Sequence, residues 1–181
     1  MLGHIMPASN LSNGTAKAAT VEKTSVAAEQ LAWSPDRRLS WEDFKASPDS
    51  SNTHHAMTAA NLAVDAKCNG SKFNYTVRCV FLPTESWSKN KRSKKLLYHE
   101  QLHFDLTEVH ARQLRKRLQA LGSSCSIVQS QLNETVSAAF ADWKNEQRTF
   151  DKLSNHGLDA DVTLAWSTNI DMRLKQLEQF R

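Results

Sequence analysis

The segment LLYHEQLHFDLTEVHAR, residues 96–112, carries three histidines and three carboxylates, and part of it has the spacing of a zinc site. His99, Glu100 and His103 form the pattern H-E-x-x-H. On an α-helix, residues four positions apart differ by about 40° in direction, so both imidazoles can reach one ion. Imidazole is a common zinc ligand, and a glutamate directly after the first histidine can take a proton from water. The pattern therefore predicts Zn²⁺ bound by His99 and His103, with Glu100 as the catalytic general base.

A catalytic zinc needs a third protein ligand and one open position. We favour His156, because a loop histidine that folds back over the active-site helix is a common arrangement in zinc enzymes of this kind. Three alternatives stay open: Glu134 on the next predicted helix, Asp151 after it, and His110. His110 shares the helical face of His99 but lies about 16 Å further along the axis, so a straight helix keeps it from the same ion.

The elements that must position these residues follow from local patterns. Two strands, over 59–68 and 72–82, flank the turn sequence NGSK, in which Asn-Gly is expected to supply the positive φ values. RRLSWEDF (37–44) is predicted to be a short strand that runs into a turn. Helical periodicity predicts helices over about 93–121, 127–150 and 161–180, with a break at 153–159.

Strands that precede helices favour an α+β fold. We expect a small N-terminal antiparallel or mixed sheet packed on the active-site helix, followed by two further helices. Residues 1–30 are predicted to be a flexible lead-in, part of which could derive from cloning, and residues 31–181 a single domain. If the strand near 73–82 lies at the sheet edge, it could hold an extended substrate by β-augmentation, as many peptidases do.

Composition excludes some classes of protein. The net charge of +4 comes largely from two clusters, KNKRSKK (89–95) and RQLRKR (112–117), which lack interleaved aromatics, so we predict solvated surface and no nucleic acid. No apolar run is long enough to span a membrane. Cys68 and Cys79 either pair across the predicted hairpin or are two small buried residues. We further expect Asp105 and Glu108 to support the helix, with Asp105 pairing with Arg112.

Short motifs beyond the helix carry a more specific resemblance. They are WEDF at 41–44, Ser-Trp at 86–87, HFD at 103–105, FDKLSNHG at 150–157, and Trp166 followed by Ile170. Together with H-E-x-x-H, they resemble a bacterial family of predicted secreted zinc-dependent proteases, long catalogued as a domain of unknown function. The similarity covers about residues 37–175. Leu102 stands where that family often has glycine, and Ser154 where threonine is common.

The resemblance implies a zincin-like fold and a zinc metallopeptidase that acts on peptide or protein substrates in the periplasm or outside the cell. It also implies that His156 matches the histidine of the family's H-G element. His156, if it is not a ligand, or Tyr98 could donate a hydrogen bond to the oxyanion, and we expect a monomer. Two other hypotheses stay open: a degenerate zincin that binds metal or the cell envelope without hydrolysis, and a basic helical interaction module in which H-E-x-x-H is accidental.

Overall fold

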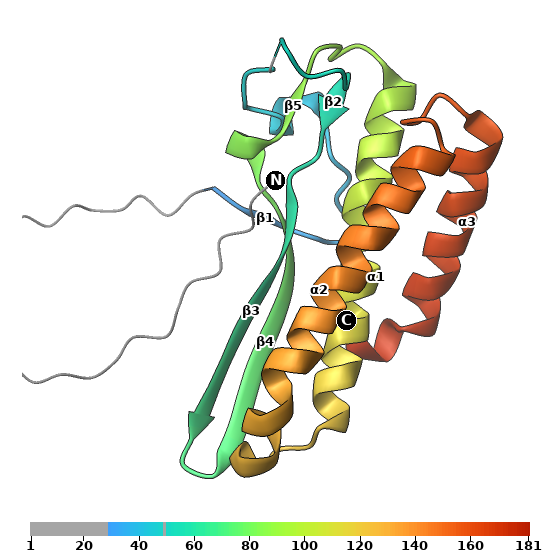
Figure 1. Ribbon diagram of the computed structural model, residues 1–181. Helices are drawn as coiled ribbons and strands as arrows, with labels where there is room; N and C mark the ends of the chain where they lie inside the picture. The colour runs from blue at the N-terminus through green and yellow to red at the C-terminus, as the bar shows by residue number, and fades with distance from the viewer. Residues whose placement is uncertain (1–28, 49) are drawn as a thin grey trace, which may run out of the picture.

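The computed structural model describes residues 29–48 and 50–181 (Figure 1). Two small antiparallel sheets lie beside three helices, as the α+β prediction required. The three-stranded sheet has the order β1-β4-β3, and β2 pairs with β5. The strands are β1 (Leu31–Ala32), β2 (Ala56–Met57), β3 (Ala60–Asn69), β4 (Lys72–Phe81) and β5 (Trp87–Ser88), and the helices α1 (Lys94–Ala120), α2 (Cys125–Leu153) and α3 (Ala160–Gln176). The predicted lead-in lies outside the described residues except for positions 29 and 30.

The hairpin of β3 and β4 forms as predicted, with a different turn geometry. Asn69 pairs with Lys72 as the last step of the ladder, so the two turn residues are Gly70 and Ser71. Gly70 alone takes a positive φ, +61°, because a glycine at the first central position suits a two-residue hairpin. The expectation that Asn-Gly together would supply positive φ values is therefore wrong for Asn69.

Strand β4 lies in the middle of its sheet, between β1 and β3. The expectation that strand 72–82 could offer a free edge is therefore wrong, and β3 pairs only with β4 among the described strands. The segment 37–44 also differs from its prediction, since residues Trp41–Asp43 form a 3-10 turn. Asp43 accepts hydrogen bonds from the backbone N–H of Ser40 and from Arg37, and such local bonds compete with strand pairing.

Helix α1 packs against the sheet and against both other helices, and it is buried over most of its length (Figure 1). One side packs on β4, where Phe104, Leu114 and Leu118 contact the apolar face of the strand. Another side packs on α2 and α3 through a second cluster that includes Leu106 and Val109. A helix covered on several sides brings its polar residues into the interior as well, and each of these then needs a partner.

Two buried charges of α1 find partners far away in the sequence. The Asp105 carboxylate accepts hydrogen bonds from Trp33 Nε1 at 2.8 Å and from Arg38 at 2.9 Å. Arg112 donates to Glu108 at 2.9 Å and to Glu178 at 2.8 Å. The predicted pair of Asp105 with Arg112 does not form, because side chains seven positions apart on this helix meet different neighbours. Both residues instead tie the ends of the chain to α1.

The two basic clusters do more than cover the surface. Lys89, Lys91 and Lys95 donate to the backbone carbonyls of Asn52, Phe44 and Leu158. In the second cluster, Arg115 donates to the carbonyl of Val77. Lys89, Lys91 and Lys95 therefore fasten loops to α1 or to the segment before it, and Arg115 ties α1 to β4. Within the described residues, no helix is both long and apolar enough to cross a membrane.

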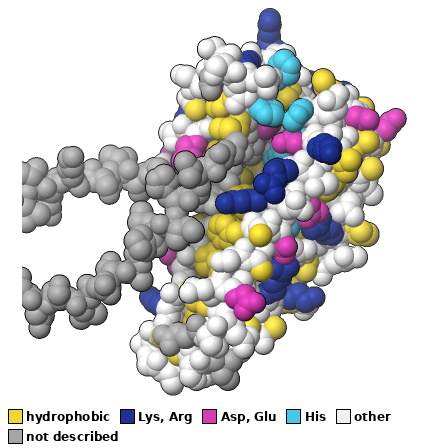
Figure 2. Space-filling model, viewed as in Figure 1, with side chains coloured by type: hydrophobic (Ala, Val, Ile, Leu, Met, Phe, Trp, Pro, Cys, Tyr) yellow, Lys and Arg dark blue, Asp and Glu magenta, His cyan; other side chains and the backbone are white. Residues whose placement is uncertain are grey.

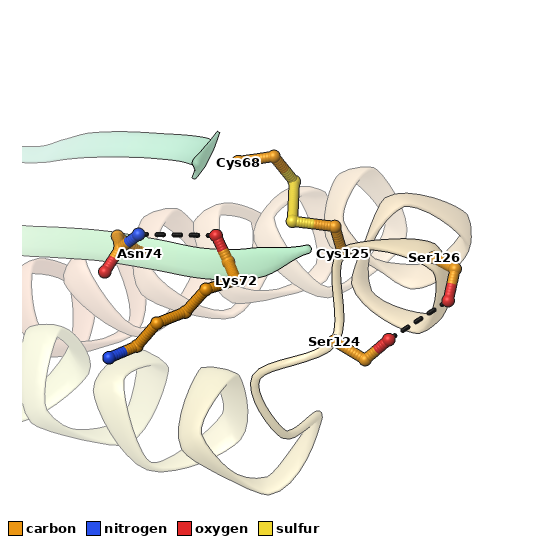
Figure 3. Close-up of a disulfide and its surroundings, with 6 residues drawn as sticks. All are labelled: Cys68, Lys72, Asn74, Ser124, Cys125 and Ser126. Carbon is orange, nitrogen blue, oxygen red and sulfur yellow. Dashed lines mark hydrogen bonds between the residues drawn. A yellow bond between two sulfur atoms is a disulfide. The ribbon is translucent and has the colours of Figure 1, made fainter. Parts of the chain in front are cut away.

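The disulfide joins Cys68 to Cys125, at the tip of the hairpin (Figure 3). Pairing of Cys68 with Cys79 is wrong, because Cys79 lies opposite Leu62 well inside the ladder and is buried under α1 as a free thiol. The turn before α2 docks on the hairpin tip through Phe73 N–H to Ser123 O at 2.8 Å. This contact brings Cα of Cys125 to 5.9 Å from Cα of Cys68, a separation that a disulfide can bridge.

The disulfide should account for a large part of the stability. Replacing Cys125→Ser should lower the free energy of unfolding by about 3–4 kcal/mol, because the bond closes a loop with a sequence separation of 57. Denaturant unfolding under oxidising conditions measures the change, with Cys79→Ala as a control that keeps the disulfide. Peptide mapping without reduction should find Cys68 linked to Cys125, and a Cys68–Cys79 peptide would contradict the assignment.

Candidate metal centre

Three side chains from α1 and α2 converge on one point. Nε2 of His99 and Nε2 of His103 lie 3.0 Å and 2.9 Å from the same oxygen, Oδ1 of Asp151. The two Nε2 atoms are 3.1 Å apart. The histidines are one turn apart on α1, and Asp151 reaches them from the C-terminal end of α2. These residues form the one group of three or more His, Cys, Asp and Glu side chains among the described residues that could hold a metal ion.

The donor set fits a small divalent cation. In a tetrahedral zinc site with ligands about 2.0–2.1 Å from the metal, neighbouring ligand atoms lie about 3.3 Å apart. The triangle of 2.9, 3.0 and 3.1 Å is close to that size. The side chain of His99 is only 2% exposed and that of His103 13%, whereas Asp151 is 34% exposed. Asp151 is therefore the most exposed of the three side chains.

Gln147 fixes the orientation of His103. Its Nε2 donates to the carbonyl of His103 at 2.9 Å and to Oγ1 of Thr107 at 3.0 Å, so its Oε1 must accept. That oxygen lies 2.5 Å from Nδ1 of His103, which places a proton on Nδ1 and turns Nε2 toward the centre. A hydrogen bond to the far nitrogen is the usual way in which proteins orient a histidine toward a metal. Trp143 completes this network by donating to Oγ1 of Thr107.

Aromatic rings pack against the two histidines. The ring of Phe150, which is fully buried, lies 4.6 Å from that of His99 and 4.9 Å from that of His103. Trp166 of α3 packs behind Phe150 at 5.3 Å. His99 has no second hydrogen bond of the kind that holds His103, since its buried Nδ1 has no partner among the described residues. Its position therefore depends on packing.

The electrostatics of the group follow from one shared carboxylate. Burial alone would raise the pKa of Asp151, but hydrogen bonds from His103 and His99 hold that pKa far below its ordinary value. Burial lowers the pKa of His99. Burial also acts to lower the pKa of His103, but the hydrogen bond and charge of Asp151 outweigh it and leave the pKa raised. The centre thus keeps an ionised carboxylate between two imidazoles, which is a set of ligands for a cation.

Glu100 follows His99 directly on α1 and is buried, being 3% exposed. Its negative charge acts to raise the pKa values of both His99 and His103. Its backbone carbonyl accepts a hydrogen bond from Thr58, in the chain just before β3. Glu100 is therefore a buried carboxylate outside the triangle of His99, His103 and Asp151.

The loop after α2 closes over His99. Three consecutive residues, Asn155, His156 and Gly157, have positive φ values of 49°, 54° and 79°. A Cβ on Gly157 would lie 2.8 Å from both Cβ and Cγ of His99, so only glycine allows this approach. Ser154 stabilises the turn, because its hydroxyl accepts from the N–H of Gly157 at 3.3 Å.

His156, the predicted third ligand, lies beside the group and outside its triangle. Its Nδ1 is 3.5 Å from Oδ1 of Asp151, its side chain is 50% exposed, and its ring packs against that of His54 at 4.7 Å. Asp151, named from the sequence as an alternative, occupies the third corner instead. His156 therefore contacts a candidate ligand from outside the triangle.

The other two alternatives lie elsewhere. Glu134 is exposed on α2, seventeen positions before Asp151 and so about 25 Å away along the helix. His110 is buried two turns beyond His103, and its Nε2 lies 2.7 Å from Oε2 of Glu146. That carboxylate also pairs with Arg173, and despite its burial these bonds lower the pKa of Glu146 to about 2.

One comparison with known proteins identifies the family. The family described as "bacterial protein of unknown function" (DUF922) matches residues 34–157. The chain belongs to this family. No curated protein and no solved structure matches the chain. The matched region of this family member runs from just before the 3-10 turn at Trp41 to Gly157, so it contains all three corners of the triangle, Glu100 and the loop that covers His99.

The structure of this family member explains residues of the motif FDKLSNHG. In FDKLSNHG, Phe150 packs under the histidines, Asp151 faces them, and Ser154 and Gly157 build the turn. Gln147 was not predicted, although a signal exists. It precedes Asp151 by four positions, which repeats on α2 the spacing of His99 and His103 on α1, so both pairs lie on the facing sides of two packed helices.

The close approach of Gly157 can be tested by adding one methyl group. Gly157→Ala should lower the free energy of unfolding by about 2 kcal/mol more than Gly122→Ala does, because both glycines have positive φ but only Gly157 abuts His99. Gly122 is the matched control, since a Cβ there meets no atom within 4 Å. Denaturant unfolding of the two variants gives the difference, and equal losses would contradict the contact.

Proposed function

We propose that this chain is a zinc-dependent metallopeptidase with a zincin-like site, in which Glu100 acts as general base. The convergence of His99, His103 and Asp151 on one point carries the proposal, because H-E-x-x-H alone also occurs in proteins without metal. Asp151 of α2 places Oδ1 at 3.0 and 2.9 Å from the two Nε2 atoms, which is a suitable separation for ligands of one ion. An accidental H-E-x-x-H pattern would not be expected to have such a third atom from a separate helix. The resemblance of the motifs to predicted secreted zinc-dependent proteases supports the same assignment.

In this proposal the third ligand is Asp151, and His156 stays outside the coordination sphere. Gln147 and Phe150 hold the two imidazoles so that their Nε2 atoms face the ion. Two histidines and a carboxylate with one open position are a known ligand type for catalytic zinc. Zinc would supply Lewis acidity there, polarising the scissile carbonyl and making water easier to deprotonate.

Glu100 then performs the proton transfers. Its carboxylate would take the proton from the attacking water and pass it to the amine that leaves, so the carboxylate is regenerated in each turnover. His156 would donate a hydrogen bond to the oxyanion, a role supported by its half-exposed side chain beside Asp151. Tyr98 is less suitable, since its hydroxyl donates to Ser167 of α3 at 2.6 Å.

An extended substrate could pair with β3, the strand at the edge of the sheet. The chain just before β3 contacts the centre through Thr58 and the carbonyl of Glu100, so a peptide paired with the start of β3 would lie near the metal. The disulfide of Cys68 with Cys125 favours an oxidising compartment, which supports a periplasmic or secreted protein. We keep the prediction that the protein works as a monomer.

Metal content is the first test. The purified protein offered zinc should carry about one ion per chain, and both His99→Ala and Asp151→Asn should reduce the affinity by at least about 10-fold, because each removes a ligand. His156→Ala should retain the metal. Elemental mass spectrometry after dialysis measures the content. If His156→Ala loses zinc while Asp151→Asn keeps it, the third ligand is His156.

Hydrolysis is the second test. Glu100→Gln should keep the zinc of the wild type and lower kcat by at least about 100-fold, because the amide matches the carboxylate in shape but cannot accept the proton. Cleavage of an unfolded protein substrate, followed by mass spectrometry of the products, measures the rate. Zinc bound stoichiometrically without hydrolysis by the wild type would reduce the protein to a metal-binding member of the family.

A further inference from the structure

We infer that the surface around the candidate metal centre selects acidic peptide segments. The inference rests on the proposed peptidase function, which it extends to a class of substrate. Three segments form this surface, which we call the basic rim: residues 50–58, 86–100 and 151–158. Its chemistry follows from the side chains that these segments carry and from the contacts that hold them together.

The segments of the basic rim are joined to one another around the centre. Strand β2, within the first segment, pairs with β5, within the second. The ring of His54 packs on that of His156, which joins the first segment to the third. Lys95 Nζ donates to the carbonyl of Leu158 at 2.7 Å, one turn before His99 on α1, and joins the second segment to the third. The three segments therefore present one continuous surface to a molecule that approaches the metal.

The basic rim holds the whole positive excess of the protein. It contains six cationic side chains and two acidic ones, Glu100 and Asp151. The cations are Lys89, Lys91, Arg92, Lys94, Lys95 and Lys152. The excess of four equals the net charge of the entire chain, +4, so the remaining residues balance. Lys and Arg side chains lie beside the gathered histidines on the face shown in Figure 2.

The acidic side chains of the basic rim are the two that the proposed chemistry uses. Asp151 is matched by the two imidazoles, and a bound Zn²⁺ would add two further positive charges. Within these bounds the exposed charged side chains of the rim are all cationic, while Glu85 and Asp159 lie directly outside them, the latter as the cap of α3. Clefts lined by one sign of charge raise the local concentration of oppositely charged ligands and speed their association by about 10- to 1,000-fold.

A peptide fits this surface better than a nucleic acid does. Lys89, Lys91 and Lys95 are committed to backbone carbonyls. Among the described residues, no side-chain partner is recorded for the other three cations, which are exposed. A protein that tracks a nucleic-acid backbone typically neutralises about 6–10 phosphates. Three exposed cations next to a proposed hydrolytic centre match a short run of Asp and Glu on either side of a scissile bond.

The first experiment compares two peptides. They share a cleavable core and differ in flanks of Glu or of Lys, and each carries a fluorophore. Anisotropy with zinc-loaded Glu100→Gln protein measures binding without turnover, and wild-type protein gives kcat/KM. The Glu-flanked peptide should bind at least about 10-fold more tightly at low ionic strength, with a difference that shrinks as salt rises toward 0.5 M.

The second experiment reverses the charge of two side chains of the basic rim. In the Glu100→Gln background, the double variant Arg92→Glu with Lys94→Glu should weaken binding of the Glu-flanked peptide by at least about 5-fold and strengthen that of the Lys-flanked peptide. Lys67→Glu is the matched control, because it lies near the hairpin tip, about 23 Å along β3 from Ala60 and beyond the Debye length of about 10 Å. It should change neither affinity appreciably.

The outcomes separate this inference from the proposed function. Preferential binding of the Glu-flanked peptide without hydrolysis by wild type would uphold the inference and overturn the peptidase. Equal affinity for both peptides, or no binding of either, would overturn the inference even if hydrolysis occurs. A single-stranded DNA oligonucleotide that binds at 0.15 M salt more tightly than the Glu-flanked peptide and displaces it would also overturn it, in favour of a nucleic-acid ligand.

Discussion

The burial of polar side chains on α1 is the constraint that organises this molecule. A buried polar group without a partner costs about 1–3 kcal/mol, and α1 carries several on different sides. Asp105 is satisfied by Trp33 and Arg38, which draw the N-terminal segment onto the helix. Arg112 is satisfied from the C-terminal end through Glu178. The chain therefore wraps around a central polar helix, and both of its described ends are fixed by the same requirement.

The candidate metal centre is a special case of that constraint. The two histidines of α1 are buried. Their hydrogen-bonding partners on α2 are Gln147 and Asp151, which have the same four-residue spacing. Gln147 satisfies one ring nitrogen completely, because its own amide is fixed by the backbone of α1. The Nε2 atoms and the shared oxygen are left facing one another. His103 is held by a hydrogen bond and His99 by packing, so the three convergent atoms need little rearrangement to bind a cation, which is the pre-organisation that functional sites require.

The two ends of the helical layer serve different purposes. At the hairpin tip, the Cys68–Cys125 disulfide locks α2 against β3, so the start of α2 is anchored covalently. At the opposite end, α2 delivers Asp151 and then turns through three residues of positive φ, which bring Gly157 against His99. The strained backbone lies beside the proposed chemistry, where such conformations concentrate in enzymes. The basic rim lies at that same end of α2, so the positive-φ turn and the cationic side chains are found together.

Local sequence was sufficient to predict the hairpin, the three helices and the placement of His99 and His103 on one helical face, because each depends on residues within one or two turns of each other. The H-E-x-x-H spacing needs only a helix, and the helix needs only its periodicity, the cap at Ser93 and the stop at Gly122. The identity of the third corner could not be predicted in this way. Asp151 and His156 are five positions apart, and which one faces the histidines depends on how α2 docks on α1 and on the turn after it. The disulfide partner of Cys68 was undetermined for the same reason, since Cys125 is remote in sequence and adjacent only because the turn before α2 packs on the hairpin tip. Sequence by itself determined the chemistry that is available, whereas only the tertiary structure decided which groups meet, because contacts between distant segments are set by the packing of the whole core.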